Sequence, residues 1–370
     1  MRKQEVIRNM MIGLSGIGKF LIQNTPLLFH CRNYCRMHVS ALIIASAACV
    51  YSCNNSLDRN DQQNASGDSA GNSGDSTLLA QYEPRELKTN WSKHTIPIDS
   101  IYDGGVGKND IPAIDYPEFV SQEQANGFLT GPDFGIIVTG EQIQKFYPFS
   151  ILNWHEVVND FLGRIPIAVT FCPLCGSAIV FNRIVDGDTL IFGVSGKLYE
   201  SNLLMFDEKT ESLWSQALGE CVAGDFAGKK LSLFNSAIVT YEDIEKNFPD
   251  AKVLSTQTGF DRNYTRDPYA DYVSNEALYF PVSKKSDRYE NKEMMYVVQL
   301  EKTSVAFPWK QLLKNGKAKV ATSGGTVEVE VKNFLPAASR IEDSTPINGY
   351  FSYWFSWYAV NGATGKVWTQ

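Results

Sequence analysis

The sequence predicts an α+β fold that is rich in β-structure, with antiparallel or mixed sheets and few, short helices. Short runs of β-branched and aromatic residues recur along the chain, and turn residues such as Asp186 and Gly187 separate them. Only two stretches, 148–160 and 240–247, have a helical pattern, and Pro249 follows the second. Many strands with few helices favour this architecture. Strands are expected at 135–139, 165–171, 177–185, 189–195, 202–206, 212–216, 294–300, 326–334 and, as an aromatic core strand, 352–358.

The N-terminus resembles a targeting segment. Arg32 and Arg36 precede a short apolar run at 41–51, and Cys53 follows in the pattern of a bacterial lipobox. No apolar run in the sequence reaches the roughly 18 residues that a membrane-spanning helix needs. We therefore expect a signal segment at 1–52 and a lipid on Cys53, which would anchor an exported lipoprotein to the membrane of the cell envelope, on its periplasmic or outer-membrane face. An uncleaved anchor and an ordinary cleaved signal are the alternatives.

A polar tether is expected between the leader and the folded domain. Residues 53–77 are rich in Ser, Asn, Gly and Asp, which predicts a disordered linker. Apolar and aromatic residues return at 78, so we expect one domain over 78–370. Without residues 1–52 the chain has 28 Lys and Arg against 40 Asp and Glu, a formal net charge of −12. Such a chain lacks the basic patches that phosphate contacts need, so nucleic-acid binding is not expected.

A degenerate internal repeat is predicted at an offset of 160 residues. GIIVTGEQIQKFYPFSIL at 135–152 aligns with MYVVQLEKTSVAFPWKQL at 295–312. The two repeat units extend over about 135–185 and 295–335. Two β-hairpins, each with a short helix, would account for such a pattern.

Cys172-Pro-Leu-Cys175 is the only Cys-x-x-C sequence outside the leader. It is compatible with a redox dithiol, a metal site or a structural disulfide. A strand-like run follows it instead of a helix, which argues against a thioredoxin-type motif. His155 precedes it, and the second repeat unit has Asn315 opposite His155 and Lys332 opposite Cys172. The first unit therefore carries residues that the repeated scaffold does not require.

Two kinds of chemistry follow from these residues. Together with Cys221, they would offer three thiolates and one imidazole to copper or zinc, if the fold brings them together. In a catalytic role, Cys172 would be the nucleophile, His155 the base and Cys175 the resolving thiol. The structural alternatives are a disulfide between Cys172 and Cys175, or free thiols packed as small apolar side chains.

His155 begins the stretch His-Glu-Val-Val-Asn-Asp, in which Glu156, Asn159 and Asp160 stand at helical spacings. Asn159 stands where the zincin HExxH helix has its second histidine, so that motif is excluded. The structural alternative is a satisfied histidine that closes a short helix. Other polar and aromatic residues among glycines could line a small-molecule pocket or cap β-turns. The predicted pocket consists of Glu156, Asn159, Asp160, Tyr199, Ser201, Asn202, Trp214 and Gln216.

The blocks YPFSILNWHEVVND, FCPLCGSAIVFNR, FGVSGKLYESNLLMFD and SLWSQ resemble an exported bacterial family catalogued as domain of unknown function 3179. The resemblance continues into RDPYADY at 266–272 and SYWFSWYAV at 352–360. It implies no assigned activity. The family's pattern implies that the position of Cys175 tolerates replacement. This favours a site made by Cys172 and His155 over one that requires both thiols. Cys221 lies outside the pattern.

We therefore expect a membrane-tethered lipoprotein with a Cys/His site for soft-metal handling, most plausibly copper, or for thiol redox chemistry. The second hypothesis is a non-catalytic ligand-binding or scaffold lipoprotein with a structural disulfide at Cys172 and Cys175. The third is a hydrolase or transferase with a cysteine nucleophile. The predicted domain at 78–370 contains no glycine-rich phosphate loop and no Gly-x-Ser-x-Gly elbow, so it gives no support to those enzyme classes.

Overall fold

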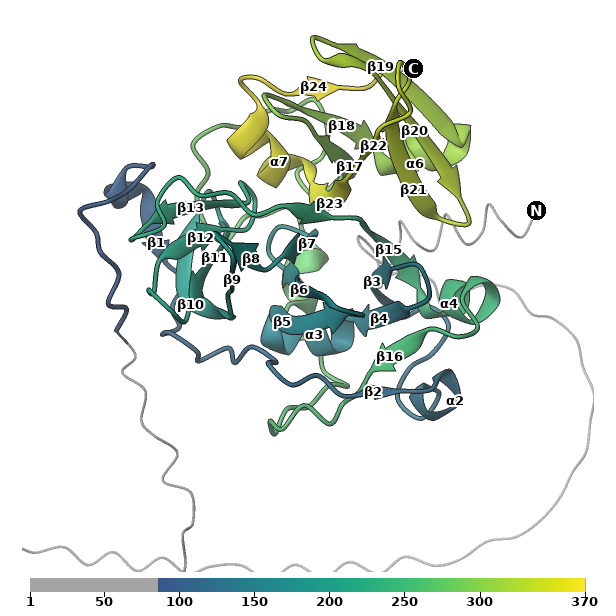
Figure 1. The fold of residues 1–370 in the computed structure, drawn as a ribbon, viewed down its shortest axis with the longest axis horizontal. Helices are drawn as coiled ribbons and strands as arrows, with labels where there is room; N and C mark the ends of the chain where they lie inside the picture. The colour runs from purple at the N-terminus through teal and green to yellow at the C-terminus, as the bar shows by residue number, and fades with distance from the viewer. Residues whose placement is uncertain (1–85, 370) are drawn as a thin grey trace, which may run out of the picture. The chain divides into compact units, whose positions relative to one another are not determined.

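The computed structural model describes residues 86–369, which form five sheets and six short α-helices (Figure 1). This confirms the β-rich fold class predicted from the sequence. The predicted leader, Cys53 and the tether lie outside the described residues, as do residues 78–85 of the predicted domain. Among the described residues, no helix has the length and apolar character needed to cross a membrane.

Two hairpins and a short helix form the segment that carries the cysteines. The segment consists of β3 (Phe134–Thr139), β4 (Gln144–Pro148), α3 (Phe149–His155), β5 (Val157–Leu162), β6 (Ile165–Cys172) and β7 (Ser177–Asn182). Pro148 ends β4 because it has no N–H for the sheet, and its φ of −63° suits the start of a helix. Gly163, with a φ of +65°, closes the hairpin between β5 and β6.

A later segment has the same order of elements. It consists of β17 (Met294–Gln299), β18 (Ser304–Pro308), α6 (Trp309–Asn315), β19 (Lys317–Thr322) and β20 (Gly325–Lys332). Each element begins 160 residues after its counterpart in the first segment. The two segments thus have the same elements at the same spacing, whereas the repeat of the sequence itself stays a prediction.

The eight-stranded sheet contains strands from both segments. Its order is β24-β18-β17-β23-β7-β6-β5, and β14 also pairs with β7. The strand β23 (Gly349–Tyr353) is antiparallel both to β17 and to β7, since Phe351 stands opposite Tyr296 and Ala178. β23 therefore joins the two segments. The other strands of this sheet are β14 (Leu233–Phe234) and β24 (Lys366–Val367).

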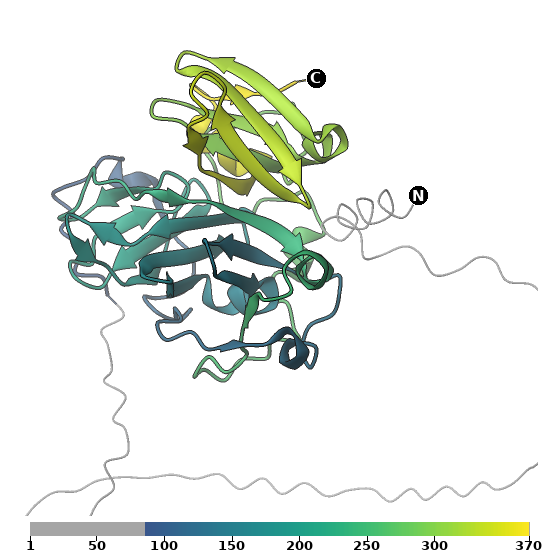
Figure 2. The ribbon, with the colours of Figure 1, turned by 45° about the vertical axis from the view of Figure 1, so that its right-hand side comes forward.

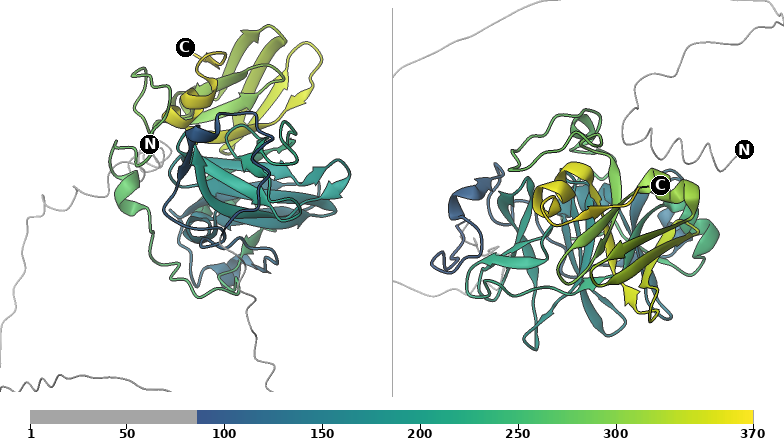
Figure 3. Two further views of the ribbon diagram at one scale, coloured as in Figure 1. Left: turned by 90° about the vertical axis from the view of Figure 1, so that its left-hand side faces the viewer. Right: turned by 90° about the horizontal axis from the view of Figure 1, so that it is seen from above.

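The remaining sheets flank this one (Figures 2 and 3). The order β15-β3-β4-β16-β2 adds β2 (Phe119–Val120), β15 (Ser236–Thr240) and β16 (Lys252–Leu254). The order β1-β10-β11-β12-β13 comprises β1 (Ile101–Asp103), β10 (Phe192–Tyr199), β11 (Asn202–Asp207), β12 (Leu213–Ser215) and β13 (Glu220–Ala223). The order β19-β20-β21-β22 adds β21 (Leu335–Arg340) and β22 (Pro346–Ile347).

The predicted hairpin at Asp186 and Gly187 is confirmed. It joins β8 (Ile184–Val185) to β9 (Asp188–Thr189), and both turn residues have positive φ, 51° and 88°. The predicted second helix is also present, as α4. The helical elements not yet named are η1 (Ile98–Ser100), α2 (Gln122–Ala125), α4 (Tyr241–Asn247), α5 (Ala270–Val273) and α7 (Trp354–Asn361).

Two local predictions are wrong. The helix expected over 148–160 ends at His155, because Glu156 takes the left-handed conformation and the β-branched pair after it enters β5. His155 and Asn159 therefore share no helical face. The aromatic stretch 352–358 is a strand only as far as Tyr353 and continues as α7. Its uninterrupted apolar composition does not distinguish a buried strand from a buried helix.

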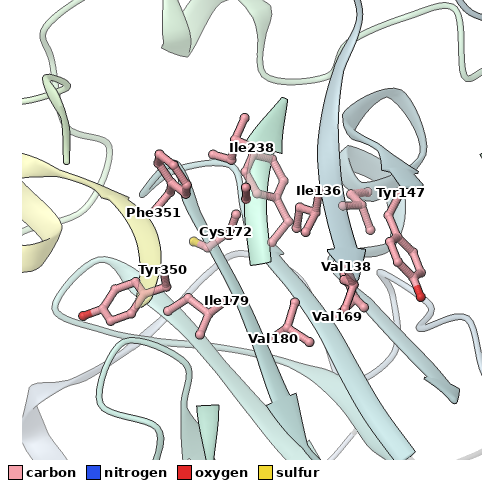
Figure 4. Packing of buried hydrophobic residues seen from close by; sticks show 14 of the residues in the cluster. Ile136, Val138, Tyr147, Val169, Cys172, Ile179, Val180, Ile238, Tyr350 and Phe351 are labelled. Atoms are coloured by element: carbon pink, nitrogen blue, oxygen red, sulfur yellow. The ribbon is translucent and has the colours of Figure 1, made fainter. Parts of the chain in front are cut away.

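Both segments contribute to the same hydrophobic core. Figure 4 shows Cys172 at the end of β6, near Ile238 of β15 and near Tyr350 and Phe351 of β23. Phe351 is 1% exposed and Cys172 is 2% exposed. The cysteine motif is thus buried beside β15 and β23 rather than on the surface.

Candidate functional site

The turn between β6 and β7, residues 172–176, carries both cysteines and is called the cysteine turn below. The backbone N–H of Cys175 donates to the carbonyl oxygen of Cys172 at 3.1 Å, which closes a β-turn. Gly176 has a φ of +52°, and a Cβ atom there would lie 2.6 Å from the ring of Tyr353. The N–H of Tyr353 donates to the carbonyl oxygen of Cys175 at 2.8 Å. β23, which follows both segments in the chain, therefore holds the cysteine turn in place.

Both cysteines of the turn are free, buried thiols whose side chains hydrogen bond to each other. Burial, followed by the interaction with Cys175, raises the pKa of Cys172 well above its ordinary value. Burial also acts to raise the pKa of Cys175, but the interactions of its sulfur with Cys172, Ser356 and Asn202 outweigh it, so that this pKa is lowered. When protonated, the Cys175 thiol donates to the carbonyl oxygen of Ser201 at 3.1 Å. Cys175 is therefore the first of the two to ionise.

Glu156 is the carboxyl group whose charge acts on the pKa of both thiols. It directly follows α3 and is 7% exposed. Burial raises its pKa to about 7, although the hydroxyl of Tyr269, which donates to Oε1 at 3.0 Å, acts to lower it. Its negative charge in turn raises the pKa of both Cys172 and Cys175. A carboxyl group that titrates near neutral pH is suited to accept a proton from a thiol and to return it.

His155 is committed to other partners. Its Nδ1 lies 2.7 Å from the carbonyl oxygen of Pro112, and its Nε2 lies 2.8 Å from the hydroxyl of Tyr264. Burial lowers its pKa to about 4, the bond to Pro112 opposes this, and the charge of Arg262 adds to it. With Nδ1 as donor to the carbonyl, Nε2 accepts from Tyr264. This geometry fits the satisfied histidine better than a catalytic base for Cys172.

Cys221 is buried in β13, and its environment is separate from the cysteine turn. Its pKa is raised to about 12 by burial and then by the charge of Asp207, and its thiol donates to the carbonyl oxygen of Ala223 at 3.5 Å. Within residues 86–369, no group of three or more His, Cys, Asp and Glu side chains is placed to hold a metal ion. The described chain therefore does not bring Cys172, Cys175, Cys221 and His155 together as one four-ligand set.

The other predicted pocket residues form internal hydrogen bonds. Asn159 donates to Asp115 at 2.6 Å and to the carbonyl oxygen of Phe192 at 2.8 Å. Asp160 accepts from Lys145 at 2.8 Å and from the hydroxyl of Tyr147 at 2.6 Å. These bonds connect β5 to neighbouring elements.

A second buried network lies beneath the start of β7. Ser177 donates to Gln216 at 2.6 Å, and Asn202 donates to both of them, at 3.1 and 3.0 Å. The indole N–H of Trp214 donates to Asp207 at 2.9 Å. The network holds Asn202 next to Cys175, where it helps to lower the thiol pKa. Tyr199 and Ser201 belong to β10 and to the turn after it, outside this network.

A cavity of about 570 Å³ adjoins the cysteine turn, and none of the eight predicted pocket residues lines it. Its walls come from both segments and from the chain between β16 and β17. They comprise Phe128, Pro132, Asp133, Phe134, Phe149, Ser150, Asn153, Phe171, Pro173, Gly176, Ile238, Tyr264, Thr265, Arg266, Asp267, Tyr269, Val273, Met294, Trp309, Phe351 and Tyr353.

Sequence reasoning missed the residues that reach the thiols from late in the chain. Tyr269 and Tyr272 belong to the RDPYADY block, and Tyr353 and Ser356 belong to SYWFSWYAV. Burial raises the pKa of Tyr272, and the charges of Cys175 and Cys172 raise it further. Both blocks carry the family resemblance, and that shared membership was the available signal. The sequence does not show that they fold against Cys172.

The comparisons with known proteins show a family and nothing closer. A family model described as "Protein of unknown function (DUF3179)" matches residues 108–345. No curated protein matches the chain, and no solved structure matches it. The match includes Glu156, both cysteines of the turn and the RDPYADY block, and it ends before β23.

Proposed function

We propose, for a chain that belongs to this family of unknown function, that it is a thiol-redox protein whose Cys172 and Cys175 alternate between dithiol and disulfide. The observation that carries the proposal is the pair of adjacent, free, buried thiols within one β-turn. In such a turn the two Cα atoms lie less than about 7 Å apart, which is within the range that a disulfide bridges.

Thiol–disulfide exchange with a small organic disulfide is the reaction that fits. The proton of Cys175 passes to Glu156, and the thiolate attacks one sulfur of the substrate. One substrate thiolate leaves and takes up a proton. Cys172 then loses its proton to Glu156 and attacks the sulfur of Cys175, which forms the protein disulfide and releases the second substrate thiol. Two thiols and one disulfide thus give one disulfide and two thiols.

The burial of the two sulfurs limits which reactants can reach them. Cys172 is 2% exposed and Cys175 is 0% exposed, so the sulfurs are closed to the surface of a folded partner protein. Pro173 and Gly176 of the cysteine turn line the cavity. A small molecule in the cavity would lie against the turn, and the turn would open toward it for reaction. The site therefore suits small oxidants.

The test is the redox state of the thiols in glutathione buffers. The protein is equilibrated at graded ratios of glutathione to glutathione disulfide, alkylated, and analysed by mass spectrometry. We expect an intramolecular disulfide between Cys172 and Cys175 that forms and reverses with the ratio. Cys221→Ser is the matched control, because this thiol is buried apart from the turn, and it should behave as the wild type does.

Two results would count against the proposal. Thiols of the turn that stay free at every ratio would remove the dithiol–disulfide cycle. An equal yield of glutathione adduct in Cys172→Ser and Cys175→Ser would show that the two sulfurs do not differ, whereas the difference in their pKa favours adduct formation on Cys175.

Cu(I) binding by the two sulfurs alone is the second candidate. Two adjacent thiolates suit a soft monovalent ion, whereas a structural zinc site needs four protein ligands, which the described residues do not supply here. Copper analysis of protein loaded with Cu(I) separates the two ideas. One copper per chain that is lost in both Cys172→Ser and Cys175→Ser would support this role, and equal copper content in all three proteins would dismiss it.

The same proposal includes the attachment of the protein to a membrane. The pattern that ends at Cys53 supports cleavage of residues 1–52 and lipidation of the new N-terminus. Labelling with a clickable fatty acid in a bacterial host tests this. Cys49, which follows Ser46-Ala47-Ala48, is the weaker lipobox candidate. We expect incorporation into the wild type, little into Cys53→Ala and full incorporation into Cys49→Ala. Label that depends on Cys49 instead would assign the anchor to the other cysteine.

A further inference from the structure

The cavity beside the cysteine turn is built from corresponding positions of the two segments. Phe134 and Met294 begin β3 and β17, and Phe149 and Trp309 begin α3 and α6; all four line the cavity. The chemistry-bearing residues come only from the first segment and from the loop before β17. The scaffold is thus similar on the two sides, and the reactive groups lie on one side.

The walls of this cavity are flat, rigid aromatic faces. Phe149 stacks on Phe171 with ring centroids 4.1 Å apart, and Trp309 meets Phe351 edge-on at 4.9 Å. Tyr264, Tyr269 and Tyr353 add to the lining, as do two further phenylalanines. A cavity of about 570 Å³ with such walls has the size and the apolar character of a small-molecule site. Aromatic rings of this kind favour a planar ligand, which they stack against.

The acidic groups of the lining already have donors. Asp133 accepts from the N–H of Thr130 at 2.6 Å and from its hydroxyl at 2.9 Å. Asp267 accepts from Asn153 at 3.0 Å and from the N–H of Tyr269 at 2.8 Å. Arg266 is exposed and so remains in contact with water. The enclosed surface therefore favours a neutral ligand over an organic ion.

The lining of the cavity contacts Glu156, the carboxyl group whose charge acts on both thiols. Tyr269 lines the cavity, and its hydroxyl donates to Glu156 at 3.0 Å. Glu156 in turn acts on both Cys172 and Cys175 through its charge. Pro173 and Gly176 bring the cysteine turn itself to the cavity wall. A ligand in the cavity is thus next to a source of two electrons and next to a chain of groups that exchange protons.

From these observations we propose that the cavity binds a quinone, a flat and neutral acceptor of two electrons and two protons, which oxidises the dithiol of Cys172 and Cys175. This inference rests on the proposed redox function and names the oxidant. Both S–H bonds break and one S–S bond forms. The two electrons and the two protons pass to the quinone, whose two carbonyl oxygens become the hydroxyls of the hydroquinone, and Glu156 and Tyr269 carry the protons.

The experiment uses duroquinone, whose fully methylated ring disfavours a stable thioether with the cysteines. Reduced protein is mixed with duroquinone without oxygen, the loss of quinone absorbance is followed, and the product is analysed by mass spectrometry. We expect one quinone consumed for each disulfide formed between Cys172 and Cys175. Val273→Trp, which places an indole in the cavity from the half-buried face of α5, should slow this reaction about tenfold or more.

Glutathione disulfide serves as the second oxidant and as a check that the variant folds. Val273→Trp should reach the same equilibrium fraction of disulfide as the wild type in glutathione buffers, because this fraction depends on the unchanged thiols and not on the rate of access through the cavity. Ser150→Phe blocks the same cavity from α3 and provides a second variant if the first does not fold. Wild-type protein that glutathione disulfide oxidises but duroquinone does not would overturn the inference and leave the redox function standing. Equal duroquinone rates in wild type and variants would overturn it as well. Protein that neither reagent oxidises would overturn both.

Discussion

Glu156 takes a backbone conformation that its residue type disfavours. Its φ is +57°, and it ends α3, whereas the corresponding end of α6 has Gly316 with a φ of +72°. A non-glycine residue in this region costs roughly 1 kcal/mol or more, and such strain is concentrated at functional sites. Glycine would end α3 at less cost. The position therefore retains the side chain of Glu156 at a cost in backbone strain, which agrees with the role of proton carrier that we propose for it.

The raised pKa of Glu156 predicts a pH-dependent stability. The folded-state pKa of about 7 lies above the ordinary value of 4.5, so the bound proton stabilises the fold fully below pH 4.5, and this contribution is lost as the pH rises through 7. The shift corresponds to up to about 3 kcal/mol. Glu156→Gln keeps a neutral side chain at every pH. The variant should gain stability relative to the wild type by this order between pH 4.5 and 8, measured by denaturant unfolding.

Parallel stability curves for the two proteins would mean that Glu156 has an ordinary pKa. The same variant should slow disulfide formation near neutral pH, because the proton acceptor is gone. Asp188→Asn is a suitable control, since this carboxylate is exposed in the hairpin between β8 and β9. It should change neither the slope of stability with pH nor the oxidation rate.

The sequence indicated the region of the site but not the roles within it. Glu156 was in the predicted pocket through its place beside His155, and the histidine was expected to be the base. Which of the two adjacent side chains acts on the thiols is decided by tertiary structure, because α3 ends at the left-handed Glu156. The helix predicted over 148–160 would have continued through this position. The burial that moves the two pKa values in opposite directions, to about 4 and about 7, is likewise a tertiary effect.

At the scale of the element, the cysteine turn depends on one glycine and one aromatic ring. The sequence predicted a strand on each side of the turn, because both β6 and β7 are short apolar runs. It did not predict that Tyr353 lies against Gly176 or that β23 lies beside β7. A pairing between strands so far apart in the chain has no local signature.

Gly176→Ala should therefore be costly. The new Cβ would take a left-handed backbone and would lie 2.6 Å from the ring of Tyr353. Strain and overpacking together are expected to reduce the free energy of unfolding by about 3 kcal/mol. Gly316→Ala is the matched control, since that glycine also has positive φ but no neighbouring atom within 4 Å. It should cost only about 1 kcal/mol, and an equal loss in the two variants would show that the contact with Tyr353 does not constrain the turn.

At the scale of the whole molecule, the two segments depend on a strand that follows both of them. β23 pairs with β17 on one side and with β7 on the other, and α7 then buries Trp354, Phe355 and Trp357. The recurring order of hairpin, helix and hairpin followed from local patterns that the sequence displays. The way the two segments close on each other did not, because it is made by a third piece of chain.

Truncation separates these contributions. The family model matches residues 108–345, so a chain that ends at 345 retains that match but lacks β23 and α7. We expect it to lose cooperative unfolding and to aggregate, because β17 would become an unpaired edge and β7 would keep only its short pairing with β14 on that side, beside exposed core residues. A chain that ends at Gly365 lacks only β24, an edge strand, together with the few residues that follow it. This shorter truncation should unfold cooperatively at a lower midpoint, since it also removes the contact of Trp368 with Phe307.

Unfolding of both chains is measured by circular dichroism and calorimetry. Cooperative unfolding of the chain that ends at 345 would show that the segments associate without β23. In that case the cysteine turn would keep its thiols but lose the backbone bond from Tyr353, and the cavity beside it would be open.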